Sequence, residues 1–151
     1  MGSQRGGYTT VVVGTDGSET SFRAVERAAE LARDAGAQLV IACAYVPERP
    51  DPHAQDVLGD EAYQVTGSAP ADDTVRRARD LAIAAGATKV ETVSEQGKPA
   101  DTLCRIVQER SADLLVVGNR GLNTLAGRII GSVPLDVVRH APVDVLVVHT
   151  T

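Results

Sequence analysis

Residues 9–46 read TTVVVGTDGSETSFRAVERAAELARDAGAQLVIACAYV. The stretch opens on a short apolar run rich in β-branched residues, Thr9–Gly14, which predicts a strand. Residues Ser18–Ala35 then carry apolar side chains at helical spacing, and Gly36 is a suitable stop. Gln38–Val46 is a second apolar run with little alternation, which is typical of a strand covered on both faces. Strand, helix and strand in this order predict a βαβ unit.

The rest of the chain repeats this alternation. Five strands with intervening helices predict a single-domain α/β fold with a five-stranded, parallel, doubly wound sheet and helices on both faces. The expected elements are a helix over Ala71–Ala85, an edge strand over Lys89–Ser94, a helix over Pro99–Arg110, a strand over Asp113–Val117, a helix over Ser132–His140 and a last strand over Val143–His149.

Two stretches fall outside this pattern. Residues 1–8 are rich in glycine and polar residues, so we expect a flexible N-terminal segment ahead of a domain over residues 9–151. Pro47–Pro70 is rich in proline and is expected to form a long excursion with a short helix near Asp56–Gln64. Loops this long are often functional or mobile, and a variable surface insertion fits equally well.

Composition excludes several function classes. The chain has 151 residues, 43% of them hydrophobic and 23% charged, which is typical of one globular domain. A net charge of −5 with few aromatic residues argues against nucleic-acid binding. No apolar stretch is long enough to span a membrane. Cys43 and Cys104 share no CxxC spacing and are interpreted as small buried hydrophobic residues, which favours a reducing compartment and a cytoplasmic location.

Two of the expected strands end in small, polar residues. In parallel sheets, ligands bind beyond the carboxyl ends of the strands. Gly14–Ser18 follows the first strand and Gly118–Gly121 the fourth, and Gly131 and Ser132 open the next helix. Glycine lets the backbone approach a phosphate, and a helix N-terminus favours an anion. Ser132 as a plain N-cap, and the glycines as ordinary turn residues, are the alternatives.

The spacing of these residues resembles a known signature. Gly118-x-x-Gly121, nine further residues and then Gly131-Ser132 is similar to the pattern of the ATP-binding branch of the universal stress protein family. The surrounding chain is similar as well, except over Pro47–Pro70. The matching stretches are VVVGTDGSE at 11–19, ADLLVVGNRG at 112–121 and GRIIGSVPLDVVRHAPVDVLVV at 127–148.

The resemblance implies a sheet ordered 3-2-1-4-5, with an adenine nucleotide (ATP, AMP or cyclic AMP, with or without Mg²⁺) across the first and fourth strands. It implies that Asp16 contacts ribose or a metal-bridged phosphate, and that Ala44 and Val117 line the adenine. A turn role for Asp16 and core packing for Val117 stay open. The expected nucleotide-binding residues are Gly14, Thr15, Asp16, Ala44, Val117, Gly118, Asn119, Arg120, Gly121, Arg128, Gly131, Ser132 and Val133.

One position departs from the family pattern. Many ATP-binding relatives carry Ser or Thr where this chain has Pro134, which offers neither a hydroxyl nor an N–H. A nucleotide with fewer phosphates, such as AMP or cyclic AMP, would need fewer donors. The alternative is that Pro134 only stiffens the first helical turn.

The sequence carries no recognisable catalytic motif. His53, His140 and His149 are scattered, and Asp51, His53 and Asp56 in a Pro-rich loop do not predict a metal site. We therefore expect a non-catalytic nucleotide binder acting as a sensor or reservoir in stress physiology. The alternative is an enzyme that slowly hydrolyses ATP or transfers a group from it on the same fold.

The last strand suggests a homodimer. In the implied order, Val143–His149 lies at an edge of the sheet, and its residues Val145–Val148 carry no charge. Apolar edge strands are normally covered, and a second copy paired antiparallel about a two-fold axis would do so. Capping by the N-terminal segment or a loop is the alternative.

Overall fold

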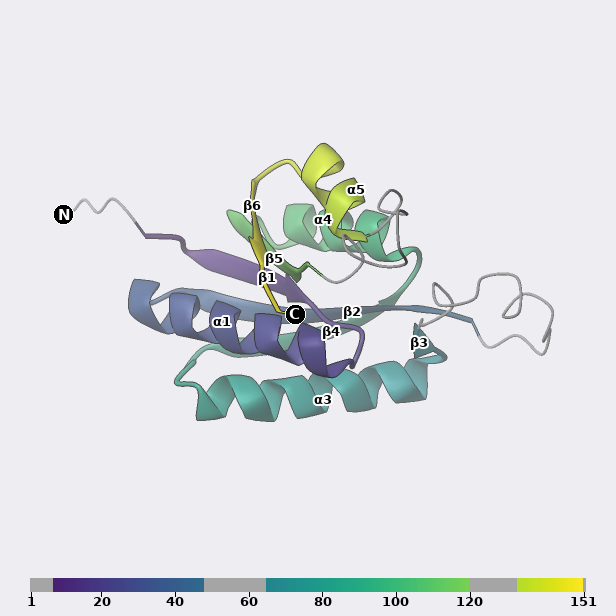
Figure 1. Ribbon diagram of the computed structural model, residues 1–151, viewed down its shortest axis with the longest axis horizontal. Helices are drawn as coiled ribbons and strands as arrows, with labels where there is room; N and C mark the ends of the chain where they lie inside the picture. Colours follow the sequence, from purple (N-terminus) through teal and green to yellow (C-terminus); the bar gives the residue numbers. More distant parts are fainter. Residues whose placement is uncertain (1–6, 48–64, 120–132, 151) are drawn as a thin grey trace.

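The computed structural model describes residues 7–47, 65–119 and 133–150. All strand pairs in it are parallel, and Figure 1 shows the sheet with helices on its two faces. The strands are β1 (Thr10–Gly14), β2 (Gln38–Val46), β3 (Val65–Thr66), β4 (Val90–Gln96), β5 (Leu114–Gly118) and β6 (Asp144–Val148), and the helices are α1 (Glu19–Ala35), α3 (Ser68–Ala84), α4 (Pro99–Glu109) and α5 (Val133–His140).

The longer strands lie in the order β4-β2-β1-β5-β6. Numbered without the short β3, this is the order 3-2-1-4-5, so the predicted fold class and topology are confirmed. Strand β3 was not predicted, because two residues are too few to show a pattern. It pairs with the last two residues of β2, Tyr45 and Val46.

Alternate residues of each central strand enter two separate cores. On one face of the sheet, Val11 and Ile41 pack with α1 and α3. On the other face, Val12, Val40 and Leu115 pack with α4 and α5. Because both faces are covered, β2 lacks polar alternation, as its sequence predicted.

The helix ends have identifiable causes. The side chain of Ser18 accepts a hydrogen bond from the N–H of Ser21 and caps α1, and Gly36 ends the same helix in the left-handed conformation. Pro99 occupies the first turn of α4. Helix α3 begins three residues earlier than predicted, at Ser68, because Pro70 in a first turn forfeits no helical hydrogen bond.

The structure leaves some expectations untested. The short helix expected near 56–64, and His53 with its acidic neighbours, lie outside the described residues. The division into residues 1–8 and 9–151 stays a prediction, although the hydroxyl of Tyr8 donates to Asp144 in β6 at 2.9 Å. No helix among the described residues is long and apolar enough to cross a membrane.

Candidate functional site

The carboxyl ends of β1, β2 and β5 lie side by side. Gly14, the last residue of β1, pairs with Ala42 of β2, and Val13 pairs with Val116 of β5. Ala44 therefore lies two residues beyond the end of β1, and Val117 directly follows the last residue of β5 that pairs with β1. The structure thus brings together the three strand ends at which the sequence predicted a ligand.

Three of the predicted residues face the α4 and α5 side of the sheet. Val117 belongs to the core on that side, and Val133 at the start of α5 packs against it. Ala44 follows Ala42 by two residues and so faces the same way. A Cβ at Gly14 would lie 2.8 Å from Cδ1 of Leu103 in α4. The described floor of the site is therefore small and apolar, and Gly14 has no room for a side chain.

The turn after β1 is held by its own hydrogen bonds. The hydroxyl of Thr15 lies 2.7 Å from that of Ser21 and accepts from the N–H of Gly17 at 3.1 Å. Oδ1 of Asp16 accepts from the N–H of Ser18 at 2.9 Å. This gives Asp16 the turn role that the sequence left open, and its contact with a nucleotide stays a prediction.

Asn119, which we predicted to bind nucleotide, connects the ends of β5 and β6. Its amide oxygen accepts from both the N–H and the hydroxyl of Thr150, at 2.8 and 3.0 Å. Its backbone N–H donates to the carbonyl of Val148 at 2.9 Å. Sequence reasoning missed Thr150, because nothing in a terminal HTT pattern signals a buried hydroxyl. A contact between Asn119 and a nucleotide stays a prediction.

The remainder of the predicted phosphate site is only partly visible. Arg120, Gly121, Arg128, Gly131 and Ser132 lie outside the described residues. Pro134 is buried in the first turn of α5, where a missing N–H costs no helical hydrogen bond.

Cys43 lies beneath the site on the α1 and α3 side of the sheet. Burial raises the pKa of its thiol to about 12, and the charges of Asp16 and Asp72 add to the effect. Burial also raises the pKa of Cys104. Neither thiol is poised to act as a thiolate at neutral pH. Cys43 is buried as predicted, whereas Cys104, on α4, is only partly buried.

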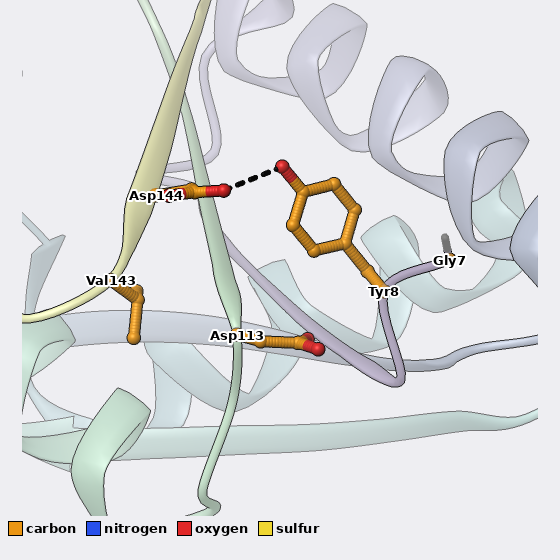
Figure 2. Close-up of a pocket in the computed structure, with 5 residues that line it drawn as sticks. All are labelled: Gly7, Tyr8, Asp113, Val143 and Asp144. Atoms are coloured by element: carbon orange, nitrogen blue, oxygen red, sulfur yellow. Dashed lines mark hydrogen bonds between the residues drawn. The ribbon is translucent and has the colours of Figure 1, made fainter. Parts of the chain in front are cut away.

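The cavity in Figure 2 lies at the opposite edge of the sheet. It measures about 530 Å³ and is lined by Gly7, Tyr8, Asp113, Val143 and Asp144. These residues stand at the amino ends of β1, β5 and β6, away from the predicted ligand site. Sequence reasoning missed this cluster, whose only signal is an aspartate at the start of each of two apolar runs, Asp113 before β5 and Asp144 as the first residue of β6.

Asp113 organises that amino edge. Its carboxylate accepts from the backbone N–H groups of Thr9 and Thr10 at 3.0 and 3.1 Å, and from the hydroxyl of Thr9. Burial by itself would raise the pKa of Asp113, but these hydrogen bonds outweigh it and hold the pKa below its ordinary value. The cluster joins β1 to β5 and has the geometry of a structural support.

Comparisons with known proteins agree with this architecture. Residues 7–149 match the model of the universal stress protein family. The chain is 55% identical over 144 residues to the universal stress protein Rv1636 of Mycobacterium tuberculosis, covering 95% of this chain and 98% of that protein. It is 32% identical to a putative universal stress protein of Staphylococcus aureus, covering 95% and 85% of the two chains.

Solved structures give the same answer. A universal stress protein crystallised in complex with cAMP is 46% identical, with a TM-score of 0.78 and coverage of 97% of this chain and 100% of that one. The structure of Rv1636 superimposes with a TM-score of 0.64 over 98% of this chain. The resemblance read from the Gly118–Ser132 spacing is therefore confirmed, and the chain belongs to the universal stress protein family.

Proposed function

We propose that this protein binds an adenine nucleotide at the carboxyl ends of β1, β2 and β5. The observation that carries the proposal is the shared orientation of Ala44 and Val117, which form a small, apolar floor facing the α4 and α5 side beside Gly14, where Leu103 packs. Such a floor suits a flat aromatic base. The relative that is 46% identical and crystallised with cAMP supports the same assignment.

The polar part of the nucleotide would extend from this floor toward α5. The described hydrogen bond of the Asp16 carboxylate uses Oδ1, and none among the described residues uses Oδ2. We therefore assign Asp16 to the ribose, with Oδ2 as the acceptor. The phosphates would lie against the backbone between β5 and α5, where glycines permit close approach. The residues proposed for this part are Thr15, Gly118, Asn119, Arg120, Gly121, Arg128, Gly131, Ser132 and Val133.

The proposal favours a nucleotide with few phosphates. Pro134 is buried against the core and supplies neither a hydroxyl nor an N–H at the start of α5. AMP or cyclic AMP needs fewer donors than ATP, so we expect either to bind more tightly than ATP, and Mg²⁺ to matter only for ATP.

Calorimetry with cyclic AMP, AMP and ATP tests the binding. We expect saturable binding of at least one nucleotide, and weaker binding of ATP unless Mg²⁺ is present. Guanosine nucleotides are the matched control. An absence of heat with all three adenine nucleotides would refute the proposed function.

We further propose that the protein is a sensor or reservoir and not an efficient enzyme. At the β1 turn, the hydroxyls of Thr15 and Ser21 are hydrogen-bonded to each other. The alternative is a slow ATPase, for which His149 is the candidate base, because its Nδ1 lies 3.4 Å from the amide nitrogen of Asn119 in the proposed site. Phosphate release at about 1 per second or faster with ATP and Mg²⁺ would refute the non-catalytic proposal, and its loss in His149→Gln would assign the activity to this site.

Finally, we propose a cytoplasmic homodimer joined through β6. Val145 and Val147 of this strand are only partly buried, and Val138 in α5, which contacts β6, is 53% exposed. An apolar strand at the end of the sheet order needs a cover. Light scattering at micromolar concentration should report twice the monomer mass, and a monomer would rule out this interface.

A further inference from the structure

Thr150, which follows β6, is buried and fully hydrogen-bonded. Its N–H and hydroxyl both donate to the amide oxygen of Asn119, at 2.8 and 3.0 Å. Its carbonyl oxygen accepts from Nη1 of Arg23 in α1 at 2.7 Å. Thr150 is 4% exposed, so these contacts fix it in one position.

What Thr150 touches is the carboxyl end of β5. A Cβ at Gly118 would lie 3.4 Å from Cγ2 of Thr150 and 3.8 Å from Cβ of Ala24 in α1. Gly118 is therefore enclosed between the chain end and α1, on the face of the sheet opposite to Val117. Asn119 is held from the same side by both hydrogen bonds to Thr150. Two residues of the proposed site thus depend on a residue that lies outside it.

The hydrogen bonds of Thr150 also connect the two halves of the proposed site. Arg23 belongs to the helix that follows the β1 turn, and Asn119 directly follows β5. The hydrogen bonds Arg23–Thr150–Asn119 therefore join α1, which follows the turn proposed to bind ribose, to the end of β5, where the proposed phosphate-binding segment begins. Both links are short hydrogen bonds, and that between Thr150 and Asn119 is buried.

We propose that Thr150 is a positioning residue for nucleotide binding. It holds Gly118 and Asn119 against α1 from the face away from the base. This inference rests on the proposed function. Because apparent affinity scales with the fraction of molecules in the competent arrangement, loss of these hydrogen bonds should weaken binding by about tenfold.

Graded variants test the inference. We expect the chain ending at His149 to bind its preferred nucleotide, among cyclic AMP, AMP and ATP, about tenfold more weakly than the unmodified chain. Thr150→Val keeps the shape and the backbone hydrogen bonds, so we expect about a threefold loss. Thr150→Ser restores the hydroxyl and should bind within about twofold of the unmodified chain.

A matched control separates positioning from general stability. Leu39→Val truncates a fully buried side chain at the amino end of β2, so it lowers the melting temperature without approaching the site. We expect its nucleotide affinity to be unchanged. Equal loss of affinity in Leu39→Val and the chain ending at His149, at matched melting temperatures, would overturn the positioning role.

Amide hydrogen exchange without nucleotide provides a readout that does not depend on binding. In the chain ending at His149, the N–H of Asn119 should exchange at least about tenfold faster, while that of Leu39 should not change. Unchanged exchange at Asn119 would overturn the inference even if the unmodified chain binds nucleotide. Failure of the unmodified chain to bind any of the three nucleotides would instead refute the proposed function.

Discussion

The amino and carboxyl edges of the sheet are formed by the same strands but carry different types of residue. At the amino edge, the Asp113 carboxylate accepts hydrogen bonds from the backbone of Thr9 and Thr10, and the Tyr8 hydroxyl donates one to Asp144. At the carboxyl edge, glycines, a turn and the chain end meet instead. The Asp113 carboxylate satisfies backbone groups at the first edge, whereas the second is formed by glycines packed against neighbouring side chains. The difference agrees with our proposal that the amino edge serves stability and the carboxyl edge binds the ligand.

A buried hydroxyl without a partner also distinguishes the carboxyl edge from the amino edge. The hydroxyl of Thr102, in the first turn of α4, is fully buried and has no hydrogen-bond partner among the described residues. It faces Gly97, where a Cβ would lie 2.5 Å from it and where φ is +145°. Gly97 directly follows β4, so this imperfect packing lies at the carboxyl edge. Departures from ideal packing are expected where function, and not stability, sets the sequence.

The largest expected effect comes from filling the binding edge. Gly14→Val would place a branched side chain against Leu103, where the structure leaves 2.8 Å to a Cβ. We expect nucleotide binding to weaken by more than about 100-fold, together with a loss of about 2 kcal/mol in the free energy of unfolding. Calorimetry and urea denaturation measure the two effects.

The control for Gly14→Val removes the steric cause. In the double variant Gly14→Val, Leu103→Ala, the clash is relieved at the cost of the Leu103 packing. Recovery of affinity in the double variant supports the steric explanation. Affinity in Gly14→Val within about threefold of the unmodified chain would contradict the placement of the base over β1.

The next effect belongs to the amino edge. Asp113→Ala leaves the N–H groups of Thr9 and Thr10 without their carboxylate, so we expect a loss of about 2–3 kcal/mol in the free energy of unfolding. Nucleotide affinity should not change, because the site lies at the other edge. A large loss of affinity with preserved folding would show that the two edges are not independent.

The same carboxylate gives the amino edge a pH dependence. The pKa of Asp113 is lower in the folded protein than its ordinary value, so its contribution is present above about pH 4 and is lost as the pH falls through the folded value. Asp113→Ala should therefore differ from the unmodified chain at neutral pH and converge with it under acid. Urea denaturation at pH 7 and pH 3 measures the convergence.

A variant at the carboxyl edge should raise the free energy of unfolding. Thr102→Val replaces the unpartnered hydroxyl with a methyl group of similar shape, so we expect a gain of about 1 kcal/mol in the free energy of unfolding. Thr102→Ser keeps the hydroxyl but removes the methyl group, and should be less stable than the unmodified chain. A destabilised Thr102→Val would mean that the hydroxyl has a partner after all.

The sequence anticipated the two edges unequally. Periodicity and β-branched runs predicted the strands because buried parallel strands have a strong pattern, as in Gln38–Val46, whereas the strand order came from the family resemblance. The strand ends at Gly14 and Gly118 were selected because small, polar residues follow two buried runs, and ligands bind at the carboxyl ends of parallel strands. Thr150 and Asp113 were missed because their partners lie far away in the sequence. Thr150 contacts a residue about 30 positions away and Asp113 contacts residues more than 100 positions away, and single polar residues carry no periodic signal. Pairing such residues requires the folded topology.

The smallest effect tests how the amino edge holds the start of the chain. The hydroxyl of Tyr8 donates to Asp144 at 2.9 Å in an exposed hydrogen bond, which Figure 2 draws as a dashed line. Because exposed hydrogen bonds contribute little, we expect Tyr8→Phe to lower the free energy of unfolding by about 0.5 kcal/mol at pH 7.

This small contribution should have a distinctive pH dependence. The hydrogen bond to Asp144 raises the pKa of Tyr8, with burial and the charge of Asp144 adding to it. A raised pKa means that the folded state holds the phenol proton more tightly, so the stabilisation is complete below about pH 10 and is lost as the pH rises through the folded value. Asp144→Asn retains an acceptor without the charge, and so should lower the Tyr8 pKa while preserving most of the stability. Ultraviolet titration of the phenol in the unmodified chain and in Asp144→Asn measures the shift, using Tyr8→Phe to identify its signal. An unshifted titration in Asp144→Asn would show that Asp144 does not hold Tyr8, and the amino edge would then depend on Asp113.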